Sequence, residues 1–219
     1  MQHTLILALV CLFVVPAGSQ PATPISRSAY ADRLEAMWQA QCIANWTGRL
    51  TEGARREPPF MTDDDCGQPT AGGTLTWVLD QDPWAADDDT DIEYVYVNEM
   101  AELGVLSLNG DQIRQAWIDH INDFIWVSNE QARALMDRGM RPPSTGLAAA
   151  NPFYRHIDAQ LTTEVFGALA PGLPHAALEI ADLPIETTAR THAAHASQFH
   201  VVLYALAPIT AASLSPAER

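Results

Sequence analysis

Apolar residues recur at steps of three and four along most of this chain, and this spacing restricts its fold more than any other feature. Side chains spaced in this way lie on one face of a helix, and the spacing is found in several segments between residues 28 and 206. The sequence has no long alternation of apolar and polar residues, which would indicate strands. It therefore predicts an all-α fold, a compact multi-helix bundle of about seven helices.

Capping and helix-breaking residues give the ends of the expected helices. The first helix carries an apolar stripe from Leu34 to Trp46 and is expected to end at Gly48. The second is expected to start at Thr90, in a capping box with Glu93, and to stop at Gly104. Five more helices are expected at about residues 111–124, 129–137, 157–169, 174–182 and 188–206, and residues 54–86 are expected to form a loop with a strand-like stretch at 74–79.

The composition indicates a folded protein with a strongly acidic surface. Apolar residues make up 47% of the chain and charged residues 18%, a balance that argues against disorder. The net charge of −15 disfavours nucleic acid and anionic lipid as partners, and an anionic substrate would need a metal ion to offset it. Five ring-bearing side chains are expected in the core: Trp117, His120, Trp126, Phe166 and Phe199.

The first residues of the chain indicate export. Residues 4–15 form an apolar run that is too short to span a membrane, and Pro16 and three small residues follow it. We therefore expect a signal peptide at residues 1–19, a flexible leader at 20–27, one helical domain at 28–206 and a tail at 207–219. Cys42 and Cys66 would then lie in a compartment that permits a disulfide, and both a bridge and two free thiols are compatible with the sequence.

The densest charge in the sequence lies where the second expected helix begins. Asp87, Asp88 and Asp89 precede Thr90 and Asp91, and the mutual repulsion of these carboxylates calls for a positive partner. A helix N-terminus supplies only ~0.3–1 kcal/mol per charge. We therefore predict that Asp87, Asp88 and Asp89 bind a hard divalent cation, which is Mg²⁺ or alternatively Mn²⁺ or Ca²⁺. The other interpretation is a solvated acidic helix cap without a metal.

A second run of acids, Asp63-Asp64-Asp65, has the same composition in a different context. The residues that follow it are Cys66-Gly67-Gln68-Pro69, so no helix is expected to fix its carboxylates. Neither run has the alternating ligands, glycine and closing glutamate of a calcium loop. This second run is therefore expected to be exposed loop.

Several segments in a fixed order carry a resemblance to a known family. They are a first helix that closes on Glu52, the run Asp87-Asp88-Asp89-Thr90, the pairs Ala116-Trp117 and His120-Ile121, the loop 138–146 with Pro-Pro-Ser-Thr-Gly followed by Asn151, and Ala170-Pro171-Gly172-Leu173-Pro174. In this order they resemble the ADP-ribosylglycohydrolase family, particularly its bacterial branch. The resemblance covers residues 28–206.

The resemblance implies an all-helical domain with two Mg²⁺ ions that bind the ribose of ADP-ribose and position a water molecule. Such an enzyme hydrolyses ADP-ribosyl N- or O-glycosidic bonds, and paired metals are suited to this chemistry. The residues carried over are Asp87, Asp88 and Asp89 as metal ligands, Glu52 as the acid near the scissile bond, and Ser144, Gly146 and Asn151 in the substrate loop.

One part of the family pattern is missing from this sequence. The family completes its metal site with a later Asp-x-Asp-Thr motif, and no aspartate follows Asp182 here. We therefore expect an incomplete domain that lacks the second set of metal ligands. Two alternatives stay open beside the hydrolase: an exported, non-catalytic helical module that binds calcium or a partner, and a hydrolase of another glycoside on the same scaffold.

Overall fold

Eight α-helices hold most of the described residues in the computed structural model, which describes residues 25–53, 55–70, 73–74, 86–121 and 123–210. The helices are α1 Arg27–Thr51, α2 Asp88–Leu103, α3 Gly110–His120, α4 Val127–Asp137, α5 Asp158–Leu161, α6 Val165–Leu169, α7 Pro174–Glu186 and α8 His192–Thr210. Two 3₁₀ helices, η1 Asp63–Asp65 and η2 Ser144–Gly146, and an antiparallel pair of two-residue strands, β1 Pro69–Thr70 and β2 Gly73–Thr74, complete the described elements. The predicted all-α class is confirmed.

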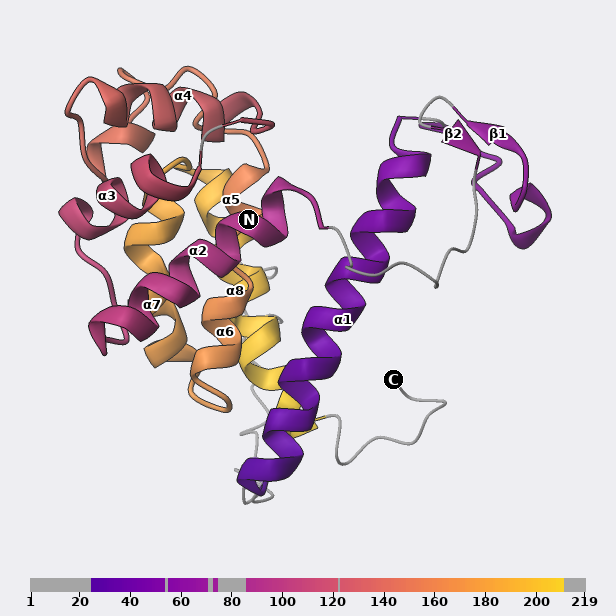
Figure 1. The fold of residues 1–219 in the computed structure, drawn as a ribbon, viewed down its shortest axis with the longest axis horizontal. Helices are drawn as coiled ribbons and strands as arrows, with labels where there is room; N and C mark the ends of the chain where they lie inside the picture. Colours follow the sequence, from indigo (N-terminus) through magenta and orange to yellow (C-terminus); the bar gives the residue numbers. More distant parts are fainter. Residues whose placement is uncertain (1–24, 54, 71–72, 75–85, 122, 211–219) are drawn as a thin grey trace, which may run out of the picture.

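Helices α2 to α8 form one body around a shared apolar core (Figure 1). Its largest fully buried side chains include Tyr96, Trp117 and Phe166, and the Tyr96 ring lies 5.4 Å from that of Phe166 and 6.3 Å from that of Trp117. Helix α6 lies close to α8 because Gly167 has no side chain: a Cβ there would come within 2.3 Å of the Val201 carbonyl oxygen. Aromatic contacts in the core and the close approach of α6 to α8 thus hold the helices of this body in place.

Helix α1 lies along one side of this body (Figure 1). It begins where the Ser26 hydroxyl accepts a hydrogen bond from the backbone N–H of Ala29, at 3.1 Å. Near its start, Tyr30 donates to the carbonyl oxygen of Ala168 and Arg33 to that of Pro208. Its first half is therefore attached to α6 and α8, and its second half leads to the loop with η1, β1 and β2.

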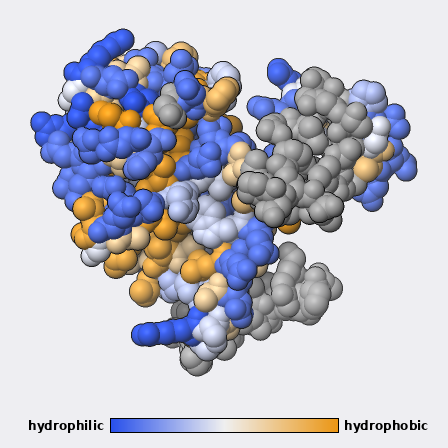
Figure 2. All heavy atoms as spheres, in the orientation of Figure 1, coloured by the Kyte–Doolittle hydropathy of each residue, from blue (hydrophilic) through white to orange (hydrophobic). Residues whose placement is uncertain are grey.

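Hydrophilic side chains cover much of the molecular face shown in Figure 2, and apolar ones gather in patches between them. None of the described helices is both long and apolar enough to cross a membrane. The proposed signal peptide at residues 1–19 and most of the expected strand-like stretch at 74–79 lie outside the described residues.

Four predicted elements are corrected by the structure. Helix α2 begins at Asp88 with Asp87 as its N-cap, so Thr90 and Glu93 lie inside the helix and form no capping box. The single helix expected at 157–169 is divided into α5 and α6, because Thr162 and Thr163 turn their hydroxyls back to backbone carbonyls. The third helix ends at His120, and α8 begins at His192, four residues later than expected.

Other predicted boundaries are confirmed or nearly so. Gly104 ends α2 with a left-handed φ of 66°, a conformation that glycine adopts without strain. Helix α3 begins with a capping box between Asn109 and Gln112. Helix α7 continues to Glu186, past Pro184. Trp117 and Phe166 are buried as expected, whereas His120, Trp126 and Phe199 are exposed, so their placement in the core was wrong.

Candidate functional site

Asp87, Asp88 and Asp89 bring three carboxylates together at the start of α2. One oxygen from each lies within 4.8 Å of the others, which is the spacing of ligands around a single cation. Asp87 is extended, with φ −103° and ψ −177°, and its side chain does not cap the helix. Asp88 and Asp89 occupy the first turn, where the helix dipole favours negative charge. The three side chains are half-buried.

The electrostatics of this triplet are unfavourable without a positive partner. Burial, and then the charge of Asp87, raises the pKa of Asp88 to about 6. Burial, and then the charges of Asp88 and Asp87, raises the pKa of Asp89 to about 8. Among the described residues, no arginine forms an ion pair with any of the three. A divalent cation would remove this repulsion, because it favours the ionised form of every carboxylate that contacts it.

The donor set fits a hard divalent cation. Carboxylate oxygens are the ligands that Mg²⁺, Mn²⁺ and Ca²⁺ prefer. Oδ1 of Asp87 is buried and has no hydrogen-bond partner in the described part of the chain, so it is free to serve as a ligand. Within the described ranges, no other group of three His, Cys, Asp or Glu side chains converges in this way. The described residues thus supply ligands for one cation rather than for two.

A cleft of about 1,000 Å³ opens beside the triplet. Three segments line it: the second half of α1, the start of α2, and the connection between α3 and α4. Glu52, the C-cap of α1, lies on the same cleft as Asp87 and Asp88, although 34 residues separate Glu52 from Asp87. Asn45 of α1 donates a hydrogen bond to the Thr90 hydroxyl and so connects the two helices next to the triplet. The structure therefore brings the predicted catalytic acid and two of the three predicted metal ligands, Asp87 and Asp88, to one cavity.

Two further acids, the buried Glu93 and the half-buried Glu164, interact with each other next to the triplet. Glu93, one helical turn after Asp89, is fully buried and accepts hydrogen bonds from the Val165 backbone N–H at 2.7 Å and the Gln41 side chain at 2.8 Å. Burial raises the pKa of Glu93, and burial together with the charge of Glu93 raises the pKa of Glu164 to about 9. Through its two hydrogen bonds, Glu93 of α2 connects this helix to α1 and α6. No local pattern indicates this role, because the spacing of Thr90 and Glu93 predicts a helix cap instead.

The three predicted substrate residues lie away from this cleft, in the connection between α4 and α5. Ser144 is exposed on η2. Gly146 is buried, and a Cβ there would come within 2.3 Å of the Glu186 carbonyl oxygen. Asn151 is fully buried, donates to the Ser128 carbonyl oxygen at 3.0 Å and accepts from the Phe153 N–H at 3.1 Å. Gly146 and Asn151 therefore hold the loop in place, and contact with a substrate stays a prediction for all three.

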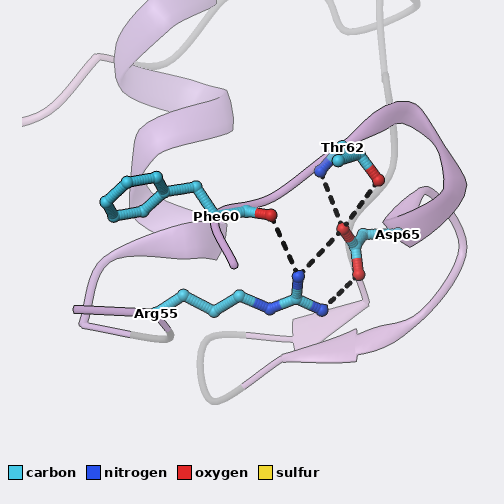
Figure 3. A network of polar contacts seen from close by, with 4 residues as sticks. All are labelled: Arg55, Phe60, Thr62 and Asp65. Carbon is cyan, nitrogen blue, oxygen red and sulfur yellow. Dashed lines mark hydrogen bonds and ion pairs between the residues drawn. The ribbon is translucent and has the colours of Figure 1, made fainter. Parts of the chain in front are cut away.

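The other acidic run has a different environment (Figure 3). Asp65 forms an ion pair with Arg55 and accepts a hydrogen bond from the Thr62 backbone N–H at 2.7 Å. The Thr62 hydrogen bond, helped by the nearby charge of Arg55, lowers the pKa of Asp65. Asp63 and Asp64 are exposed, as the sequence predicted for this loop. Cys66, next to this run, and Cys42 are both free thiols in the structure.

Sequence reasoning missed part of the cleft lining. Asp91 was expected only as a neighbour of the triplet, Phe124 was expected on the apolar face of the third helix, and nothing in the sequence marks Asp123, yet all three line the cleft together with His120 and Trp126. The apolar spacing of the third predicted helix placed Phe124 and His120 on a buried face. Because α3 ends at His120, the residues after it leave that face and reach the cleft.

Comparisons of the chain with protein-family models, with curated proteins and with solved structures found no match.

Proposed function

We propose that this protein is a divalent-cation-dependent hydrolase of ADP-ribosyl N- or O-glycosidic bonds. The observation that carries the proposal is that Glu52, at the end of α1, lines the same cleft as Asp87 and Asp88 of the aspartate triplet. Hydrolysis of a glycosidic bond needs a carboxyl group near the anomeric carbon and a means to position water. We choose ADP-ribose as the sugar because the ordered motifs of the sequence resemble those of the ADP-ribosylglycohydrolase family.

Each residue has a role that its position allows. Asp87, Asp88 and Asp89 would hold the cation, whose chemistry is to orient ribose hydroxyls and lower the pKa of a water molecule. The exposed Glu52 carboxylate can accept a proton from that water, and its negative charge stabilises positive charge at the anomeric carbon. The Asn45 hydrogen bond to Thr90 keeps α1 and α2, and thus Glu52 and the triplet, at a fixed separation.

The direct test measures release of ADP-ribose from peptides modified on arginine or serine, with Mg²⁺ and after removal of metal by a chelator. We expect activity only with the metal. Glu52→Gln keeps the size of the side chain and removes the proton acceptor, so it should reduce kcat about 10²-fold or more. Asp88→Asn should raise the Mg²⁺ concentration needed for half-maximal activity.

Asp64→Asn is the matched control, because Asp64 belongs to the other acidic run and is exposed. It should leave the rate and the Mg²⁺ dependence unchanged. Equal rates with metal and with chelator would contradict the proposal. Binding of Mg²⁺ or Ca²⁺ without hydrolysis of either peptide would instead favour a non-catalytic binding module, and hydrolysis of glycosides without the adenosine diphosphate would favour a different glycosidase.

A further inference from the structure

Two exposed aromatic side chains stand on the cleft beside the carboxylates. Phe124 is 83% exposed and Trp126 is 62% exposed, and both line the cleft from the connection between α3 and α4. The backbone of this connection is unusual, since Phe124 and Val127 have left-handed φ values of 59° and 48°, which few residues other than glycine adopt. Exposed aromatic rings inside a cleft offer a ligand a large contact area at a low cost in conformational entropy.

The charges on the same cleft have one sign. Five carboxylates line it from three segments: Glu52, Asp87, Asp88, Asp91 and Asp123. No arginine is found among the described lining residues, and the chain has no lysine. His120 is the one described lining residue that can become positive. Such a cleft concentrates cations and repels phosphate groups unless a metal ion is bound.

The remaining walls of the cleft are apolar. Ile92 and Val95 of α2, Ile121 and Ile125 contribute branched aliphatic side chains. A hard metal ion binds oxygen ligands, so it does not explain aliphatic walls or aromatic rings in the cleft. A neutral planar ligand would make no use of five separated carboxylates. The ligand class that matches all three features alternates methylene segments with several positive charges.

We propose that this cleft binds a linear aliphatic polyamine of the spermidine type. Its ammonium groups would pair with carboxylates from different segments, and one of them would lie over the ring of Trp126 as a cation–π contact. Its methylene groups would pack against the branched aliphatic walls and Phe124. The volume of about 1,000 Å³ accommodates such a chain. The proposal goes beyond the hydrolase and concerns the metal-free protein.

The test is titration calorimetry on the full chain, which is stripped of metal and then dialysed into buffer without chelator. The probes are spermidine, butylamine with a single charge, and the uncharged chain 1,8-octanediol. We expect spermidine to bind at least tenfold more tightly than butylamine, and octanediol to give no measurable binding. The affinity for spermidine should fall as NaCl is raised, because salt screens the carboxylates.

Two variants of exposed lining residues locate the site. Trp126→Leu should weaken spermidine binding about twofold to fivefold, the range expected for one cation–π contact at an exposed site. Glu52→Gln should weaken it by a similar factor. The matched controls are Phe199→Leu and Glu179→Gln, which change exposed residues on α8 and α7 that do not line the cleft, and they should bind spermidine as the unaltered chain does.

Octanediol or butylamine that binds as tightly as spermidine would overturn the proposal. So would unaltered spermidine binding in both Trp126→Leu and Glu52→Gln. The hydrolase proposal is tested with metal-loaded protein and modified peptides, and the polyamine proposal with metal-free protein and no substrate. Either one can therefore fail while the other holds.

Discussion

The two runs of three aspartates, at residues 63–65 and 87–89, have the same composition and opposite properties. Asp65 is paired with Arg55 and Thr62, and these contacts lower its pKa (Figure 3). Asp88 and Asp89 are half-buried beside each other, and their pKa values are raised to about 6 and about 8. In the first run, Asp65 is balanced by groups of this chain and the other two acids are exposed, whereas the second run calls for a partner from outside the chain.

The difference arises from what surrounds each run. The first lies on η1 in a loop, where Asp65 can turn toward an arginine of the same loop. The second is held by the start of α2, and the helix continues into Glu93, which is anchored to α1 and α6. The helix start holds the three backbone positions close together, and one oxygen of each carboxylate lies within 4.8 Å of the others. Density of charge therefore indicates a cation site only where the backbone fixes the acids.

The largest expected effect of this comparison is on the pH dependence of stability. The raised pKa of Asp89 means that the folded protein binds a proton more tightly than the unfolded chain. Its contribution is therefore fully present below pH ~4 and is lost as the pH rises to about 8. The shift from 3.8 to about 8 corresponds to at most ~6 kcal/mol, and we expect roughly 2–3 kcal/mol between pH 5 and pH 8, because this interval covers only part of the titration and the half-buried side chain is partly solvated. Urea unfolding of the metal-free protein at pH 5 and pH 8 measures it.

Asp89→Asn removes the charge and keeps the shape of the side chain, so it should raise the metal-free free energy of unfolding at pH 8 and reduce the loss between pH 5 and pH 8. The raised pKa of Glu164, about 9, also makes the folded protein less stable as the pH rises over this interval. Glu164→Gln measures how much of the loss of unfolding free energy comes from Glu164. Asp64→Asn is the control from the exposed run. A loss of stability that is identical in Asp89→Asn and in the unaltered chain would remove the basis for treating the two runs as different.

The second effect is stabilisation by a divalent cation at pH 8. A ligand that binds only the folded protein stabilises it by about 2.7 kcal/mol at a free concentration 100 times its Kd. We expect Mg²⁺ or Mn²⁺ to raise the thermal midpoint of the unaltered chain and of Asp64→Asn. The increase should be much smaller in Asp88→Asn, which loses one ligand of three. Equal increases in the two variants would place the cation elsewhere.

The sequence predicted those parts of the fold that depend on local chemistry. The apolar spacing predicted the all-helical class, Gly104 predicted the end of α2, and the aspartate triplet was identified from its density alone. These features need no knowledge of what packs against them. The pairing of Thr90 and Glu93 failed as a prediction because both side chains turn inward, Thr90 to Asn45 and Glu93 to Gln41 and Val165.

Those inward contacts join residues that are 45 to 72 positions apart, and no local pattern distinguishes them from a helix cap. The aromatic part of the cleft was missed for the same reason. Helical spacing predicted that His120 faces the core, and Trp126 was expected there as a large aromatic residue. The chain leaves the helical path after His120, so Trp126 faces the cleft. Where a helix ends decides which side chains a ligand can reach, and the end of α3 carries no glycine or proline signal.

The smallest effect belongs to Asp65, and its sign is opposite to that of Asp89. A lowered pKa means that the Thr62 hydrogen bond and the Arg55 ion pair stabilise the folded loop at neutral pH, and that this contribution disappears as the pH falls through the pKa of Asp65. Asp65→Asn should therefore accelerate hydrogen exchange of the Thr62 and Cys66 amides at pH 7, after correction for intrinsic rates, and have little effect near pH 3. High salt should reduce the difference, because exposed ion pairs are screened. Slower exchange in the variant would mean that the Asp65 charge destabilises the folded loop, as the Asp89 charge destabilises the start of α2. The two runs would then not differ.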